Sequence, residues 1–233
     1  MKKLSLFILA AVLTGMAANA QTQNRKTFKI NPGERIMDVI PRTEALSAPG
    51  FGPGTIYFRN GRYAKASLLY NYLIPGLQFI NEKGDTLMID NEKDVRYAVL
   101  GSDTFYYDHG FLRLVQTYPD MLLAEKRYFS FSNRQKLGGM GEVTSASIDT
   151  YTSVSSDNYY SEIVAREILT LSRYKYLYIG DKYNNFTVVN KKSLLDLYPG
   201  QERAVLDYLK ENKVDYSDTE AIKKLIAHFS AKH

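Results

Sequence analysis

Apolar and polar residues alternate with a period of two through the middle of the chain, from residue 55 to about residue 131. This period is typical of strands that bury one face. The expected strands are Thr55–Arg59, Arg62–Tyr70, Leu77–Ile80, Asp85–Ile89, Val95–Leu100, Thr104–Tyr107, Phe111–Gln116 and Met121–Phe131. Short strands joined by local turns predict an antiparallel meander, a curled sheet or a partial barrel.

The turns between these strands contain recognisable hairpin signals. Asn60-Gly61 joins the first two strands, and because both residues tolerate positive φ, the dipeptide favours a type I′ turn. Asn81–Gly84 joins the next pair as a longer loop closed by glycine, and Asp108–Gly110 is a further turn.

The pattern changes after a segment rich in Gly, Ser and Thr. Strands are expected over Ile163–Leu171 and Tyr174–Ile179, and the second presents Tyr174, Tyr176 and Tyr178 on one face. Phe186–Val189 completes a hairpin with it.

Apolar residues then recur with helical spacing. We expect helices over Leu194–Tyr198, Gln201–Asn212 and the residues after Ser217, where Ser217 and Glu220 have the spacing of a capping box. The last two helices should pack as a hairpin. The predicted fold class is therefore α+β: mainly an antiparallel β meander, curled sheet or partial barrel, with a small C-terminal helical hairpin.

The chain divides into five predicted regions. They are a signal peptide (1–20), an extended lead-in (21–54), the β meander (55–132), a flexible loop (133–160), and a β-hairpin followed by helices (161–233). The clearest boundary is the cluster of prolines and glycines at 48–54.

The first twenty residues have the three parts of an export signal. Lys2 and Lys3 form the basic start, Leu4–Leu13 the apolar core, and Ala18–Ala20 a small-residue cleavage site. A retained anchor is the alternative, but the apolar core has only about half the ~20 residues that cross a bilayer. The chain contains no cysteine to carry a lipid. We expect a mature protein in the periplasm or at the periphery of the outer membrane, without an N-terminal lipid or a transmembrane segment.

The amino-acid composition argues against several kinds of partner and active site. The formal charge of +5 falls to +3 without the two leader lysines, which does not indicate a nucleic-acid partner. Without cysteine, thiol nucleophiles and thiolate metal sites are excluded. No cofactor-binding, metal-binding or nucleophile-elbow motif is present, so we expect no cofactor and no metal.

Carboxylates offer the one catalytic alternative. Asp85, Asp103 and Asp108 follow or precede predicted strands, where paired carboxylates could hydrolyse a glycosidic bond. The same positions suit aspartates that bond to the backbone of their own turn, and we favour that reading. His109, in the turn after Tyr107, is likewise assigned to turn chemistry.

Aromatic content is the unusual feature: nineteen tyrosines, eleven phenylalanines and no tryptophan. Tyrosine combines a broad apolar face with a polar tip, which suits sugar stacking and protein interfaces. We predict a binding site on a tyrosine-lined, concave sheet face, built from Tyr57, Tyr63, Tyr70, Tyr72, Tyr97, Tyr106 and Tyr107.

Four segments, 70–72, 84–87, 101–107 and 210–217, resemble those of uncharacterised exported envelope proteins of Bacteroidota-type Gram-negative bacteria. The resemblance covers most of the mature chain, implies an envelope location, and assigns no catalytic residue.

These observations favour a non-enzymatic periplasmic or outer-membrane-associated protein that binds an envelope protein or glycan. One alternative is a carboxylate-dependent hydrolase of envelope glycans or peptides. A second is a self-assembling structural subunit, because the sequence leaves the oligomeric state open.

Overall fold

The computed structural model describes residues 25–137, 143–146 and 164–230. The predicted signal peptide lies outside these residues. The strands are β1 (Lys26–Ile30), β2 (Gly52–Phe58), β3 (Tyr63–Asn71), β4 (Gly76–Ile80), β5 (Thr86–Met88), β6 (Val95–Leu100), β7 (Asp103–Tyr107), β8 (Phe111–Thr117), β9 (Leu122–Leu137), β10 (Val143–Ala146), β11 (Ile168–Gly180) and β12 (Phe186–Val188). The helices are α1 (Ile36–Val39), α2 (Arg42–Ala45), the 3₁₀ turn η1 (Glu92–Asp94), α4 (Lys191–Leu197), α5 (Glu202–Glu211) and α6 (Thr219–Ser230).

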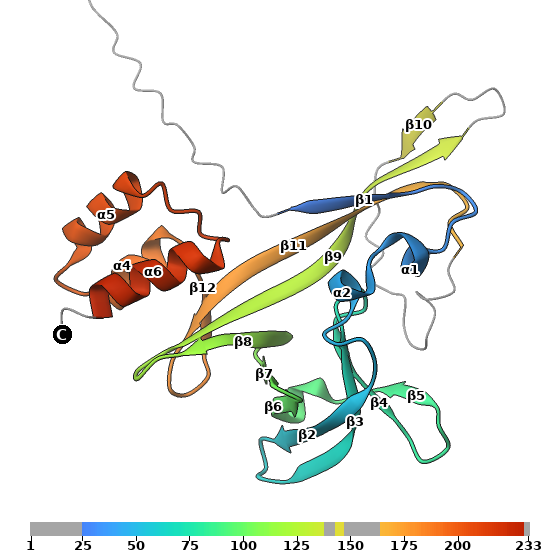
Figure 1. Cartoon of the computed structure of the whole chain (residues 1–233), viewed down its shortest axis with the longest axis horizontal. Helices are drawn as coiled ribbons and strands as arrows, with labels where there is room; N and C mark the ends of the chain where they lie inside the picture. Colours follow the sequence, from blue (N-terminus) through green and yellow to red (C-terminus); the bar gives the residue numbers. More distant parts are fainter. Residues whose placement is uncertain (1–24, 138–142, 147–163, 231–233) are drawn as a thin grey trace, which may run out of the picture.

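One open antiparallel sheet contains all twelve strands, which confirms the predicted α+β class (Figure 1). Its order is β1-β11-β9-β8-β7-β6-β2-β3-β4-β5, with β10 on β9 and β12 on β11. The expected meander is present as two runs of sequential strands, β2–β5 and β6–β9. Pairing of β2 with β6 joins the two runs.

The sheet buries one face through strand alternation. Ile56, Ala98 and Phe105 occupy paired positions on β2, β6 and β7, and each is 5% exposed or less. They form a core cluster with residues of β3 and β4, including Leu68 and Leu77. The residues that alternate with them lie on the opposite face.

The lead-in is not simply extended. β1 pairs with β11, about 145 residues further along the chain, and α1 and α2 follow it. Ile30, Ile36 and Ile40 are at most 1% exposed in a core cluster that also contains Leu171 of β11. Burial of these apolar side chains explains why the segment is ordered. The boundary cluster also contributes to the sheet, since β2 begins at Gly52.

Strands β9 and β11 are longer than the sequence predicted. They pair from Leu122↔Gly180 to Gln135↔Ile168, with a register shift near Leu171. The predicted loop from residue 133 is therefore partly wrong, because 133–137 continue β9 and 143–146 form β10 against it. Polar residues can continue a strand when a neighbour satisfies their backbone groups. The other residues of that predicted loop, 138–142 and 147–160, lie outside the described residues.

The β2–β3 hairpin forms where predicted, but its turn is not type I′. Only Gly61 has positive φ, at 82°, and its amide donates to the Phe58 carbonyl. The Phe58 amide in turn donates to the Arg62 carbonyl, and the Asn60 side chain accepts from the Arg62 amide. Three residues thus form the loop, with glycine in the left-handed region.

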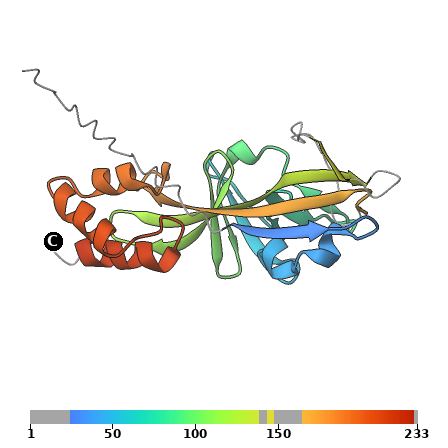
Figure 2. The same cartoon turned by 90° about the horizontal axis from the view of Figure 1, so that it is seen from above.

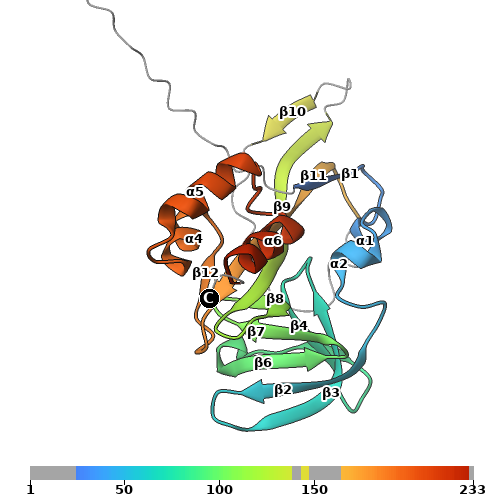
Figure 3. The same ribbon diagram turned by 60° about the vertical axis from the view of Figure 1, so that its left-hand side comes forward.

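Helices α4, α5 and α6 gather at one end of the molecule, joined to the rest by β9 and β11 (Figures 2 and 3). Apolar side chains such as Val205 and Phe229 pack there against Leu123 of β9 and Leu177 of β11. Asp218, rather than the predicted Ser217, caps α6: its carboxylate accepts from the amides of Glu220 and Ala221. Among the described residues, the helices are too short or too polar to span a bilayer.

Candidate functional site

Four of the predicted tyrosines form a continuous row across the sheet. Tyr63, Tyr57, Tyr97 and Tyr106 come from the adjacent strands β3, β2, β6 and β7, and each is paired directly with the next. Their ring centroids are separated by 6.3, 4.6 and 5.7 Å in that order. We call these four residues the tyrosine row. With neighbouring strands about 4.8 Å apart, it extends for roughly 14 Å.

The tyrosine row lies on the face turned away from the core. Ile56, Ala98 and Phe105, which immediately precede or follow row tyrosines in sequence, are buried on the other face. The row itself remains accessible: Tyr63 is 65% exposed, and the other three are half-buried. Four of the seven predicted tyrosines therefore share the outer face, opposite the side that encloses the core.

Phe186 of β12 extends the row beyond Tyr106, with centroids 5.7 Å apart. It lies over Gly180, where a Cβ atom would come within 2.5 Å of its ring. Its backbone amide donates to the Asp108 carboxylate at 2.9 Å. Phe186 is not among the residues predicted for this site from the sequence. The sequence predicted a strand that begins at Phe186, but only the tertiary structure places the Phe186 ring over Gly180.

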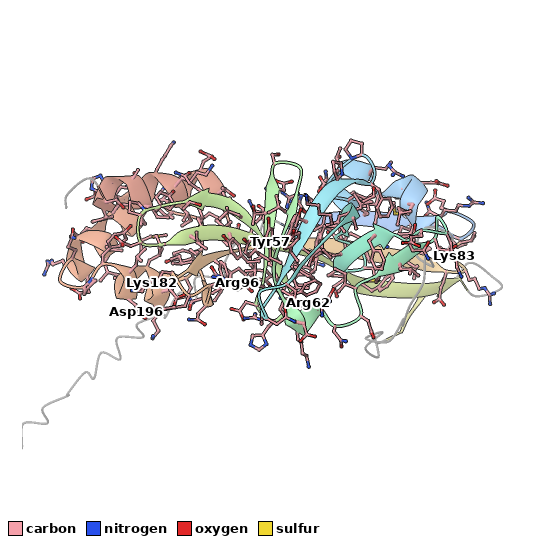
Figure 4. The ribbon with its side chains drawn as sticks, turned by 90° about the horizontal axis from the view of Figure 1, so that it is seen from below. Tyr57, Arg62, Lys83, Arg96, Lys182 and Asp196 are labelled. Atoms are coloured by element: carbon pink, nitrogen blue, oxygen red, sulfur yellow. The ribbon has the colours of Figure 1, made fainter. Side chains whose placement is uncertain are left out.

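Basic side chains border the tyrosine row. Arg62 and Arg96 are exposed on either side of Tyr57, whereas Lys182 lies away from the row, toward the helical end, with its amine over the Tyr183 ring (Figure 4). Arg96 is the additional residue where the β2–β6 register shifts after Tyr57. Burial, with Tyr97 adding to it, raises the pKa of Tyr106, and Arg96 opposes this effect. The row thus combines aromatic faces with positive charge.

The other three predicted tyrosines are elsewhere. Tyr70 and Tyr72 are 2% and 3% exposed and contact each other in the core, so they cannot form part of a surface site. Burial raises the pKa of Tyr72 to about 12. Tyr107 packs edge-on against Phe111, also at the core cluster. The alternation of apolar and polar residues could not distinguish Tyr70 and Tyr72 from the tyrosine row. The last four residues of β3 are all buried, so both faces of the strand are covered at that end.

A second aromatic group lies further along the same face. Tyr128 of β9 stacks on Tyr174 of β11 at 5.4 Å and on Tyr176 at 6.1 Å. Tyr174, Tyr176 and Tyr178 share one face, as predicted, because they alternate along β11. Burial and a hydrogen bond with Tyr176 raise the pKa of Tyr128.

The three candidate catalytic aspartates do not converge. Asp85 closes the β4–β5 turn, where its carboxylate accepts from the Asn81 side chain. Asp103 pairs with Arg113 at 3.1 Å, and Asp108 accepts from the Phe186 amide. Asp103 and Asp108 lie at opposite ends of β7, roughly 16 Å apart along the strand. His109 is fully exposed in its turn, with φ of 49°.

Comparison with protein-family models, curated proteins and solved structures finds no match.

Proposed function

We propose that this chain is an exported, non-enzymatic protein that binds a glycan of the cell envelope through the tyrosine row. The observation that supports this most strongly is the accessible run of four tyrosine rings on neighbouring strands. The predicted signal peptide and the resemblance to exported envelope proteins support the location.

The chemistry of the row suits a saccharide chain. One face of a pyranose ring carries mainly C–H groups and is flat, like the face of a tyrosine, and the phenolic hydroxyls can bond to sugar hydroxyls. A row of roughly 14 Å accommodates more than one sugar ring. Because strand pairing fixes the tyrosines, little conformational entropy is lost on binding.

Charge favours a glycan with acidic substituents. Arg62 and Arg96 border the row, and guanidinium groups bind carboxylate and phosphate groups by paired hydrogen bonds. Binding rather than hydrolysis is favoured because Asp85, Asp103 and Asp108 each have a local structural partner.

Affinity electrophoresis and calorimetry with purified envelope polysaccharide test the proposal. The double variant Tyr57→Ala, Tyr97→Ala should bind at least tenfold more weakly. Tyr183→Ala is the matched control, because Tyr183 is 71% exposed but lies outside the row. Arg96→Gln should selectively weaken binding of acidic polysaccharide.

Two outcomes would contradict this proposal. Binding that survives loss of both tyrosines would show that the row is not the site. Absence of glycan binding, together with capture of a stoichiometric protein partner from solubilised envelopes or a concentration-dependent mass in ultracentrifugation, would make the row a protein interface.

A further inference from the structure

A cavity of about 570 Å³ opens on the core face of the sheet, between α6 and the long strands. Strands β8, β9 and β11 form one wall, and the first turns of α6 form the other (Figure 3). Its lining includes five cationic side chains: Arg113, Arg127, Arg173, Lys175 and Lys223. The tyrosine row lies on the opposite face, so the cavity is a separate site.

Like charges meet directly in this cavity. Lys175 of β11 is the cross-strand partner of Arg127 on β9, and Arg173 lies two residues from Lys175 on the same face. Like charges at directly opposed positions destabilise a sheet. A half-buried position strengthens the repulsion, because less water screens it. Nothing in the packing of apolar side chains requires this arrangement.

The three arginines and Lys223 each form an ion pair with a carboxylate, whereas Lys175 has only the more distant charges of Glu125 and Asp218 near it. Glu125 pairs with both Arg113 and Arg127, and Glu44 pairs with Arg173 at 2.6 Å. The Lys175 amine donates to the Thr219 hydroxyl at 3.1 Å, and no carboxylate of the described residues forms an ion pair with it. Burial lowers the pKa of Lys175. Partly buried cations are usually paired with an anion.

We propose that this cavity binds an oxyanion, the phosphate or carboxylate group of a small ligand, with the Lys175 amine at its centre. The Thr219 hydroxyl can rotate to donate to the same oxyanion, and Arg127 is the cross-strand partner of Lys175. The volume is within the range of small-molecule sites, about 300–1,000 Å³, and accommodates a substituted monosaccharide. A bound anion relieves the repulsion between Lys175 and Arg127.

The ion pairs around Glu125 do not require Lys175, whose one side-chain hydrogen bond among the described residues is to Thr219. Glu125 and its two arginines link β8 to β9, and that link is complete without the lysine. An apolar side chain at position 175 would continue the packing of Leu177, two residues along the same face.

The test titrates the full mature chain with inorganic phosphate, against chloride at equal ionic strength, by calorimetry and thermal unfolding. Wild type should bind phosphate saturably and melt at a higher temperature when phosphate is bound. Lys175→Met should lose at least tenfold in affinity and, in chloride, melt at or above the wild-type temperature, while Lys175→Arg should retain binding. Lys126→Met is the control: Lys126 is also half-buried on β9 but faces the opposite side, where it donates to the His109 carbonyl at 2.7 Å.

Glucose 6-phosphate and glucuronate then distinguish the two sources of the oxyanion, because a phosphate site should prefer the first and a carboxylate site the second. Amide chemical shifts map the site independently of any variant, and we expect the largest changes at Lys175 and Thr219. The proposal is overturned if wild type shows no saturable response to any of these anions, or if Lys175→Met responds as wild type does. Neither result bears on glycan binding by the tyrosine row.

Discussion

Arg113 and Glu125 lie opposite each other on β8 and β9, and two guanidinium nitrogens of Arg113 donate to one oxygen of Glu125 at 2.8 and 3.0 Å. The same oxygen accepts from Nε of Arg127 at 2.7 Å. Glu125 is 4% exposed. Burial opposes its ionisation, but the two arginines outweigh burial and hold its pKa below the usual value. This carboxylate is therefore ionised at neutral pH and holds the positive charges of Arg113 and Arg127 together on β8 and β9.

Glu125→Gln should destabilise the protein strongly. Removal of the carboxylate leaves the partly buried Arg127 guanidinium without its counter-charge and leaves Arg113 with Asp103 alone, which costs about 3 kcal/mol or more. Urea unfolding at pH 7 measures the loss. Glu82→Gln, in the exposed β4–β5 turn, is the control and should change little. Equal stability of both variants would mean that the ion pairs contribute nothing net.

Glu92 should make stability depend on pH in the opposite direction to Glu125. Burial raises the pKa of Glu92 to about 7, above its ordinary value of 4.5. Its contribution to stability is therefore fully present below about pH 4.5 and is lost as the pH rises through about 7. Solvent still reaches part of the carboxyl group, so we expect Glu92→Gln to stabilise the protein at pH 8 by only about 1–2 kcal/mol.

Denaturant unfolding between pH 4 and pH 8 measures this slope. Asp94→Asn, exposed on the same 3₁₀ turn, should keep the wild-type pH profile. A Glu92→Gln variant that also keeps that profile would contradict the assignment. The slope from Glu125 is separable, because a carboxylate with a lowered pKa loses its contribution only as the pH falls below about 4.5.

Gly54→Ala should destabilise the sheet where β2 passes between β3 and β6. A Cβ atom at residue 54 would lie 2.8 Å from the Val99 carbonyl oxygen and 2.6 Å from Cδ1 of Leu68. Because a paired backbone cannot move freely, we expect a loss of roughly 1–3 kcal/mol. Thermal unfolding measures it, with Gly52→Ala as control, since no atom lies within 4 Å of a Cβ there. Similar melting temperatures for the two variants would show that the strands adjust.

The tyrosine row could be predicted largely from sequence. Tyr57, Tyr97 and Tyr106 lie in short segments whose alternation indicated strands, and their hairpin turns set the local register. Tyr70 and Tyr72 were assigned to the same surface because their strand pattern is the same. Their surroundings come from distant parts of the chain: Tyr70 stacks on Phe105 of β7, and the Arg127 guanidinium of β9 lies over the Tyr72 ring.

The predicted cap of α6, Ser217, was wrong, and the reason is local. Ser217 and Asp218 are both good caps, and Ser217 has the capping-box partner at Glu220. In the structure Ser217 donates to the Asp215 carboxylate and Asp218 takes the capping position. A competing hydrogen bond two residues earlier decided between them.

By itself, the sequence determined the strand-rich class, the hairpins, and the C-terminal helices, because each depends on periodicity and turn chemistry within a few residues. Only the tertiary structure decided that β1 pairs with β11, that β9 and β11 join the sheet to the helices, and that five cations share one cavity. These relationships join residues far apart in the chain. Backbone pairing and the burial of apolar faces choose among many such partners, and no local pattern encodes that choice.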